Sequence, residues 1–128
     1  MKELIFNLPE AIKAVSANDV KGMNYMKLSK KANKWKLDAW LVLKSQMRKQ
    51  KGVMLKGPVT LNIVYFFKVK KGRDYDNYSG GGSTKWLIDT LKSFAFSGGD
   101  SHKNVIPKIK IIEGADETAT VIRIRERR

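Results

Sequence analysis

The clearest element in the chain is a strand over residues 58–70, where apolar and polar positions alternate. Every second residue from Val59 to Val69 is apolar, which is the period of a β-strand. The intervening positions also stay largely apolar as far as Phe66, so we expect a central strand that is covered on both faces.

Two segments show helical rather than strand periodicity. The first is predicted over residues 29–51, with Ser29 as its N-cap and Gly52 as its stop. Its apolar stripe consists of Trp35, Ala39, Val42, Leu43 and Met47. The second is predicted over residues 85–96, capped by Ser83 or Thr84. Its packing positions are Trp86, Ile88, Leu91 and Ala95.

The remaining apolar runs are short. They predict an opening strand at residues 4–6 and two closing strands at 107–113 and 118–126, joined by a hairpin-like turn at 114–117. Residues 8–26 fit either a short helix or an extended arm. The resulting order β-α-β-α-β-β indicates one α+β (mixed α/β) domain over residues 1–128. We expect a small mixed sheet of about four strands with two main helices.

Charge narrows the choice of partner. The 128 residues carry 26 Lys and Arg against 12 Asp and Glu, a formal net charge of +14. Residues 27–56 alone hold ten basic side chains and the single acid Asp38. This excess favours a phosphate-bearing partner, with nucleic acid ahead of an anionic membrane surface because the charges are spread over several elements. A basic soluble protein without such a partner is the plainer alternative.

Composition also excludes some classes of site. The chain has no cysteine, which rules out disulfides and thiolate zinc sites and is compatible with a cytoplasmic location. No apolar run is long enough to cross a bilayer, and the first residues do not resemble a signal peptide. The Gly80–Gly82 run lacks the Walker arrangement, so we expect no nucleotide cofactor.

Against this basic background, four of the 12 acids fall between Asp74 and Asp100. Carboxylate oxygens suit Mg²⁺, which acts on phosphates. If the backbone is extended at Asp74 and Asp76, both carboxylates project to the same side, and Asp100 can supply a third oxygen ligand from beyond the second helix. A solvated turn is the commoner explanation of an Asp-x-Asp-Asn run, and Asn77 fits a turn or hydrogen-bonding role.

Basic side chains flank these acids. Lys85 and Asp89 lie four residues apart on one helix face, as either a weak surface ion pair or a lysine placed at the scissile phosphate. Residues 78–84, between the two parts, have the composition of a flexible loop. The strand end before the aspartates carries four cations that we expect to grip the neighbouring backbone: Lys68, Lys70, Lys71 and Arg73.

This combination resembles the RusA-type Holliday junction resolvases. The similarity lies in a basic run leading into Arg73-Asp74-Tyr75-Asp76-Asn77, in a helix that opens with Lys85 and has Asp89 four residues on, and in Asp100 soon after that helix. It covers most of the chain from about Ser29 onward. The link between Asp76 and Lys85 is longer here than in the family pattern.

The resemblance implies a homodimeric endonuclease that binds branched DNA at four-way junctions and nicks two strands symmetrically with Mg²⁺, for which Mn²⁺ is a possible substitute. Asp74, Asp76 and Asp100 match the metal-binding carboxylates of the family, and Lys85 matches its catalytic lysine. Asp89 and Asn77 take supporting roles. Two other functions fit the charge alone: a non-catalytic nucleic-acid-binding module, and a domain whose basic face meets an acidic protein.

Overall fold

The computed structural model describes residues 2–99 and 101–127, and it confirms the α+β class. The strands are β1 (Glu3–Leu8), β2 (Val59–Phe67), β3 (Val105–Glu113) and β4 (Ala119–Glu126). The helices are α1 (Ala17–Val20), α2 (Tyr25–Lys49), α3 (Asp76–Ser79) and α4 (Ser83–Leu91). The region at 8–26 therefore contains a short helix between extended segments. No helix in the described ranges is long and apolar enough to cross a membrane.

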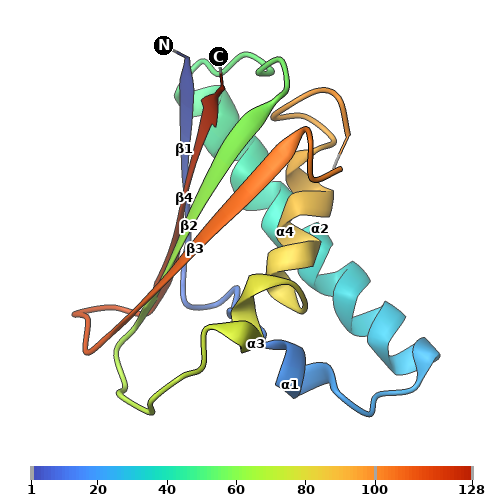
Figure 1. Cartoon of the computed structure of the whole chain (residues 1–128), viewed down its shortest axis with the longest axis vertical. Helices are drawn as coiled ribbons and strands as arrows, with labels where there is room; N and C mark the ends of the chain where they lie inside the picture. Colours follow the sequence, from blue (N-terminus) through green and yellow to red (C-terminus); the bar gives the residue numbers. More distant parts are fainter. Residues whose placement is uncertain (1, 100, 128) are drawn as a thin grey trace.

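The four strands form one mixed sheet in the order β1-β4-β2-β3, and the helices lie together on one of its faces (Figure 1). The pair β2–β3 is parallel, whereas β4 runs antiparallel to both β1 and β2. The alternation in β2 turns Val59, Leu61, Ile63, Tyr65 and Phe67 into the buried core beneath the helices.

The expectation that β2 is covered on both faces is wrong. Its other face, which includes Val64 and Phe66, is only half-buried, because the helices of the described ranges lie on the opposite side of the sheet. Cross-strand neighbours shield these side chains in part, since Val64 pairs with Val121 and Phe66 with Ile112. The protein is thus a two-layer structure with an open sheet face.

The predicted hairpin between the last two strands is also wrong. β3 and β4 do not pair with each other, because β4 lies on the opposite side of β2. The connection crosses the end of β2, where Ala115 N donates to Phe67 O at 3.1 Å. Gly114 makes this crossing with φ of 74°, and a Cβ there would lie 2.6 Å from Lys70 Cε.

Helix α2 begins four residues before its predicted start. Its N-cap is Asn24, whose Oδ1 accepts from Lys27 N at 2.9 Å, and Ser29 lies inside the helix. The predicted core positions Ala39, Leu43 and Met47 are buried. The helix ends at Lys49, two residues before the predicted end. Lys51 takes a positive φ of 51°, and Gly52 N donates back to Met47 O at 2.8 Å.

Helix α4 is shorter than predicted at its C-terminus and has a different N-cap. Gly82 is the N-cap, and both Ser83 and Thr84 are buried inside the first turn. Their hydroxyls are used elsewhere, because they bind the segment before α1 and the α3 backbone. Leu91 ends the helix, and Ala95 and Phe96 remain in the core beyond it.

Candidate active site

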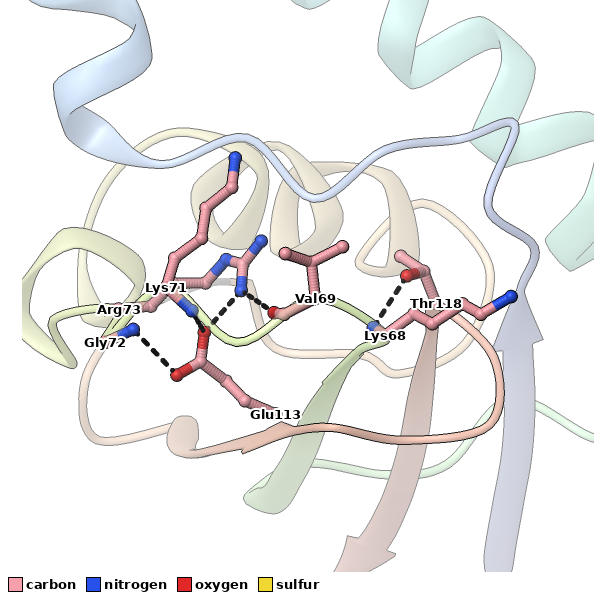
Figure 2. A network of polar contacts seen from close by, with 7 residues as sticks. All are labelled: Lys68, Val69, Lys71, Gly72, Arg73, Glu113 and Thr118. Carbon is pink, nitrogen blue, oxygen red and sulfur yellow. Dashed lines mark hydrogen bonds and ion pairs between the residues drawn. The ribbon is translucent and has the colours of Figure 1, made fainter.

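The loop that follows β2 is held in place by one carboxylate, that of Glu113 at the end of β3 (Figure 2). Lys71 N and Gly72 N donate to this carboxylate at 2.9 and 3.0 Å. The Arg73 guanidinium forms an ion pair with it. The hydrogen bond from Lys71 N, helped by Arg73 and Gly72 N, lowers the pKa of Glu113 below its ordinary value of 4.5, against the opposing effect of burial.

Glu113 was not among the predicted site residues. Its position in the sheet explains its role, because the parallel register pairs Phe67, the last residue of β2, with Glu113. An acid at the end of one parallel strand therefore lies beside the basic run at the end of its neighbour. The sequence signal was present, since Glu113 follows an apolar strand, but the parallel pairing was not predicted.

Arg73 is engaged within the protein. Besides Glu113, its Nη1 donates to Val69 O at 2.7 Å, and its guanidinium carbon lies 3.7 Å from the Phe67 ring centroid. Its side chain is only 15% exposed. Arg73 therefore shapes the loop. The other three predicted cations in this region are exposed, and their contact with phosphates stays a prediction: Lys68, Lys70 and Lys71.

Asp74 and Asp76 follow directly, and both are exposed. The extended backbone on which their convergence was predicted is not present. Tyr75 has helical angles (φ −52°, ψ −44°), Asp76 begins α3, and Asn77 N donates to Asp74 O at 3.1 Å. The two carboxylates thus stand at the surface on a turn, and the strand argument for their common side does not apply.

Asp89 does not pair with Lys85. Its carboxylate lies 3.5 Å from Lys92 Nζ and 4.0 Å from Lys36 Nζ, so it links α4 to α2 instead. Lys85 is exposed at the start of α4, at the edge of a pocket of about 330 Å³ shared with Asp89, Ser79 and residues around them. The supporting role of Asp89 stays a prediction, and Lys85 forms no ion pair with a carboxylate among the described residues.

The glycine-rich insert is packed rather than loose, contrary to the prediction from its composition. Ser83 Oγ accepts from Val15 N at 2.8 Å, and Ser83 N donates to Val15 O, also at 2.8 Å. Gly82 is required there, because its φ is 60° and a Cβ would lie 2.2 Å from Val15 O. These contacts tie the insert to the segment before α1 and fix the start of α4, the helix that carries Lys85.

A buried hydroxyl cluster holds α3 against the sheet. Thr84 Oγ1 donates to Tyr78 O, the last carbonyl but one of α3, and it hydrogen-bonds with the Tyr65 hydroxyl of β2, both at 2.5 Å. Thr84 and Tyr65 are 2% and 1% exposed. The helix that carries Asp76 and Asn77 is therefore positioned by a β2 residue and an α4 residue, and no spacing rule pointed to this cluster.

The third predicted ligand, Asp100, lies outside the described residues. Within residues 2–99 and 101–127, no group of three or more acidic, histidine or cysteine side chains is arranged to hold a metal.

Comparison with known proteins leaves the family resemblance as a prediction. No protein-family model matches the chain. No curated protein matches it either. The functional argument therefore rests on the residues themselves and on their arrangement.

Proposed function

We propose that the protein is a Mg²⁺-dependent endonuclease that binds four-way DNA junctions and resolves them by paired nicks, acting as a homodimer in the cytoplasm. The observation that carries the proposal is the pair of exposed carboxylates, Asp74 and Asp76, on a loop that Glu113 holds beside three exposed lysines. Carboxylates placed among cations suit a metal that works on a phosphate which the cations attract.

Two exposed carboxylates fit Mg²⁺, which is commonly bound by one or two carboxylates, several waters and the phosphate oxygens of the substrate. Asp74 and Asp76 would hold it, with Mn²⁺ as a possible substitute. When bound, the ion supplies Lewis-acid activation of water and stabilises charge on the phosphate. The family resemblance implies Asp100 as the third carboxylate of this site.

The side chains of this protein then have separate roles. Lys68, Lys70 and Lys71 contact phosphates on either side of the scissile bond, which positions the strand without reading its sequence. Lys85 provides a fixed positive charge for the phosphate as negative charge develops on it. Selectivity for junctions over linear duplex follows from two sites held at a fixed separation by two-fold symmetry.

A second candidate function is a nucleic-acid-binding module without catalysis. It is favoured by the turn at Tyr75, which removes the extended backbone that would align the two carboxylates, and by the lack of a three-acid group in the described part of the chain. In that case Asp74 and Asp76 only shape a loop. The basic surface would then account for the whole activity through salt-sensitive binding.

Asp76→Asn separates the two candidates, with Asp116→Asn as the matched control because Asp116 is another exposed acid, in the turn between β3 and β4. We expect Asp76→Asn to lose at least about 100-fold in junction cleavage, since metal chemistry is worth several kcal/mol. Junction binding in Ca²⁺ stays near wild type. Equal cleavage by Asp76→Asn and the control contradicts the proposed site.

Assays of the wild-type protein distinguish the broader classes of function. Salt-sensitive binding without cleavage at any Mg²⁺ or Mn²⁺ concentration supports the non-catalytic module. Failure to bind DNA even at low salt removes both functions and leaves a domain for an acidic protein partner.

A further inference from the structure

A pocket of about 480 Å³ lies next to the aspartates and has no role in the chemistry proposed above. Two of its lining residues bracket the carboxylates in the sequence, because Arg73 precedes Asp74 and Tyr78 follows Asp76 by two residues. Its other wall is the segment before α1, which passes over Lys71 and Arg73 in Figure 2. The volume lies in the range of about 300–1,000 Å³ that is typical of small-molecule sites.

The inner part of the pocket consists of flat groups, of which Phe67 and Tyr78 are buried and Arg73 lies over Phe67. The rings of Phe67 and Tyr78 lie 5.6 Å apart, and the Arg73 guanidinium covers the Phe67 ring. A planar base can stack on the outer face of this guanidinium.

The rim carries both signs of charge. Glu10 and Asp19 supply carboxylates, and Lys13 and Lys71 supply ammonium groups. The side chains of Glu10, Lys13 and Lys71 have no hydrogen-bond or ion-pair partner among the described residues. The carboxylates would repel a simple anion, and the lysines would repel a simple amine. A nucleotide satisfies both, because its base has amino donors and its backbone has a phosphate.

We propose that this pocket receives one unstacked nucleotide of the DNA strand that passes Asp74 and Asp76. The base lies against the outer face of the Arg73 guanidinium, and the phosphate lies between the two lysines. The carboxylates favour a base with an exocyclic amino group over thymine. This inference rests on the proposed DNA substrate and adds to it a reason for selecting branched DNA, in which unpairing a base at the branch costs least.

The test places 2-aminopurine at successive positions around the branch of a four-way junction, in Ca²⁺ so that binding occurs without cleavage. We expect wild-type protein to raise the fluorescence at one position as the base leaves the stack. Ala14→Phe fills the pocket, because Ala14 lines it and is half-buried. Ala11→Phe is the control, since Ala11 lies on the same segment, is exposed and does not line the pocket.

Ala14→Phe is expected to abolish the fluorescence rise and to weaken junction binding by about 5- to 150-fold, the range for losing one stacked base. Ala11→Phe and binding to linear duplex remain unchanged. If Ala14→Phe does not fold, the exposed pair Glu10→Gln and Lys13→Ala takes its place, with loss of the fluorescence rise expected. A wild-type signal in every pocket variant overturns the inference.

The two proposals can fail separately. Cleavage that depends on Mg²⁺, with no fluorescence change at any position, removes the nucleotide pocket and leaves the nuclease. A protein that binds no DNA removes both.

Discussion

Thr84→Val tests how the α3 helix is held in place. Valine keeps the shape and the β-branch of threonine, so helix propensity and packing change little. The hydroxyl is lost, and with it the hydrogen bonds to the Tyr78 carbonyl and to the Tyr65 hydroxyl. Because Tyr65 is only 1% exposed, water cannot replace the missing partner.

Leaving a buried hydroxyl or carbonyl without a partner costs about 1–3 kcal/mol. We therefore expect Thr84→Val to lower the free energy of unfolding by about 2 kcal/mol, measured by urea denaturation with the slope held near that of wild type. Thr90→Val is the matched control. Its hydroxyl is also buried in α4, but it donates to Trp86 O, a carbonyl that also takes part in the helical ladder, so its loss should cost below about 1 kcal/mol.

A double-mutant cycle isolates the Tyr65 contact. In the Tyr65→Phe background the orphaned phenol is gone, so Thr84→Val should cost less there than in wild type, by about 0.5–3 kcal/mol. The reasoning is refuted if Thr84→Val and Thr90→Val cost the same, or if the cycle shows no coupling. Because Tyr78 lies in α3 beside Asp76, the variant should also slow junction cleavage more than the control does.

Two further predictions concern the site. Lys85→Met should reduce the cleavage rate with little change in junction affinity, as gel shift and initial rates will show. Glu113 has a lowered pKa, so its contribution to the free energy of unfolding is complete above about pH 4.5 and is lost as the pH falls through the lower folded pKa. Glu113→Gln should therefore make the free energy of unfolding fall less steeply between about pH 6 and pH 3. An unchanged dependence on pH would contradict the role of Glu113 in holding the loop after β2.

The local pattern of apolar and polar residues predicted the secondary-structure elements but not which strands pair with each other. The alternation of β2 predicted its buried residues, and the apolar stripe predicted three of the four buried residues of α2, because periodicity reports which side of an element is apolar. The stripe missed Ala32, and its members Trp35 and Val42 are only half-buried. Strand pairing is a long-range property. Nothing in residues 114–117 distinguishes a hairpin from a connection that crosses β2, and the parallel β2–β3 pair that brings Glu113 to Arg73 went unpredicted.

The sequence pattern also missed the polar side chains that hydrogen-bond to backbone groups far away in the sequence. Gln46 and Gln50 appear in sequence as ordinary polar positions of a helix. In the structure the Gln46 amide exchanges hydrogen bonds with the Asn7 backbone, and the Gln50 amide does so with the Ile5 backbone. These hydrogen bonds occupy the outer edge of β1 and block further strand pairing there. Ser83 likewise appeared as a helix cap and binds Val15 instead. Such contacts depend on tertiary proximity, which residue type alone does not specify.

The acidic residues were predicted by type and not by backbone conformation. Their types and spacing predicted a metal site. The structure shows that Asp74 and Asp76 are both exposed on a turn, because Tyr75 has helical backbone angles. Metal binding by these carboxylates stays a prediction.

Cleavage of a four-way junction during a metal titration tests the central claim most directly. With each strand labelled in turn, the account predicts two symmetry-related nicks that appear with Mg²⁺ or Mn²⁺, disappear in EDTA and return when excess Mg²⁺ is added. Linear duplex remains intact under the same conditions. A junction that is bound by the protein and stays uncut across the whole Mg²⁺ and Mn²⁺ range, or is cut equally well in EDTA, would contradict it.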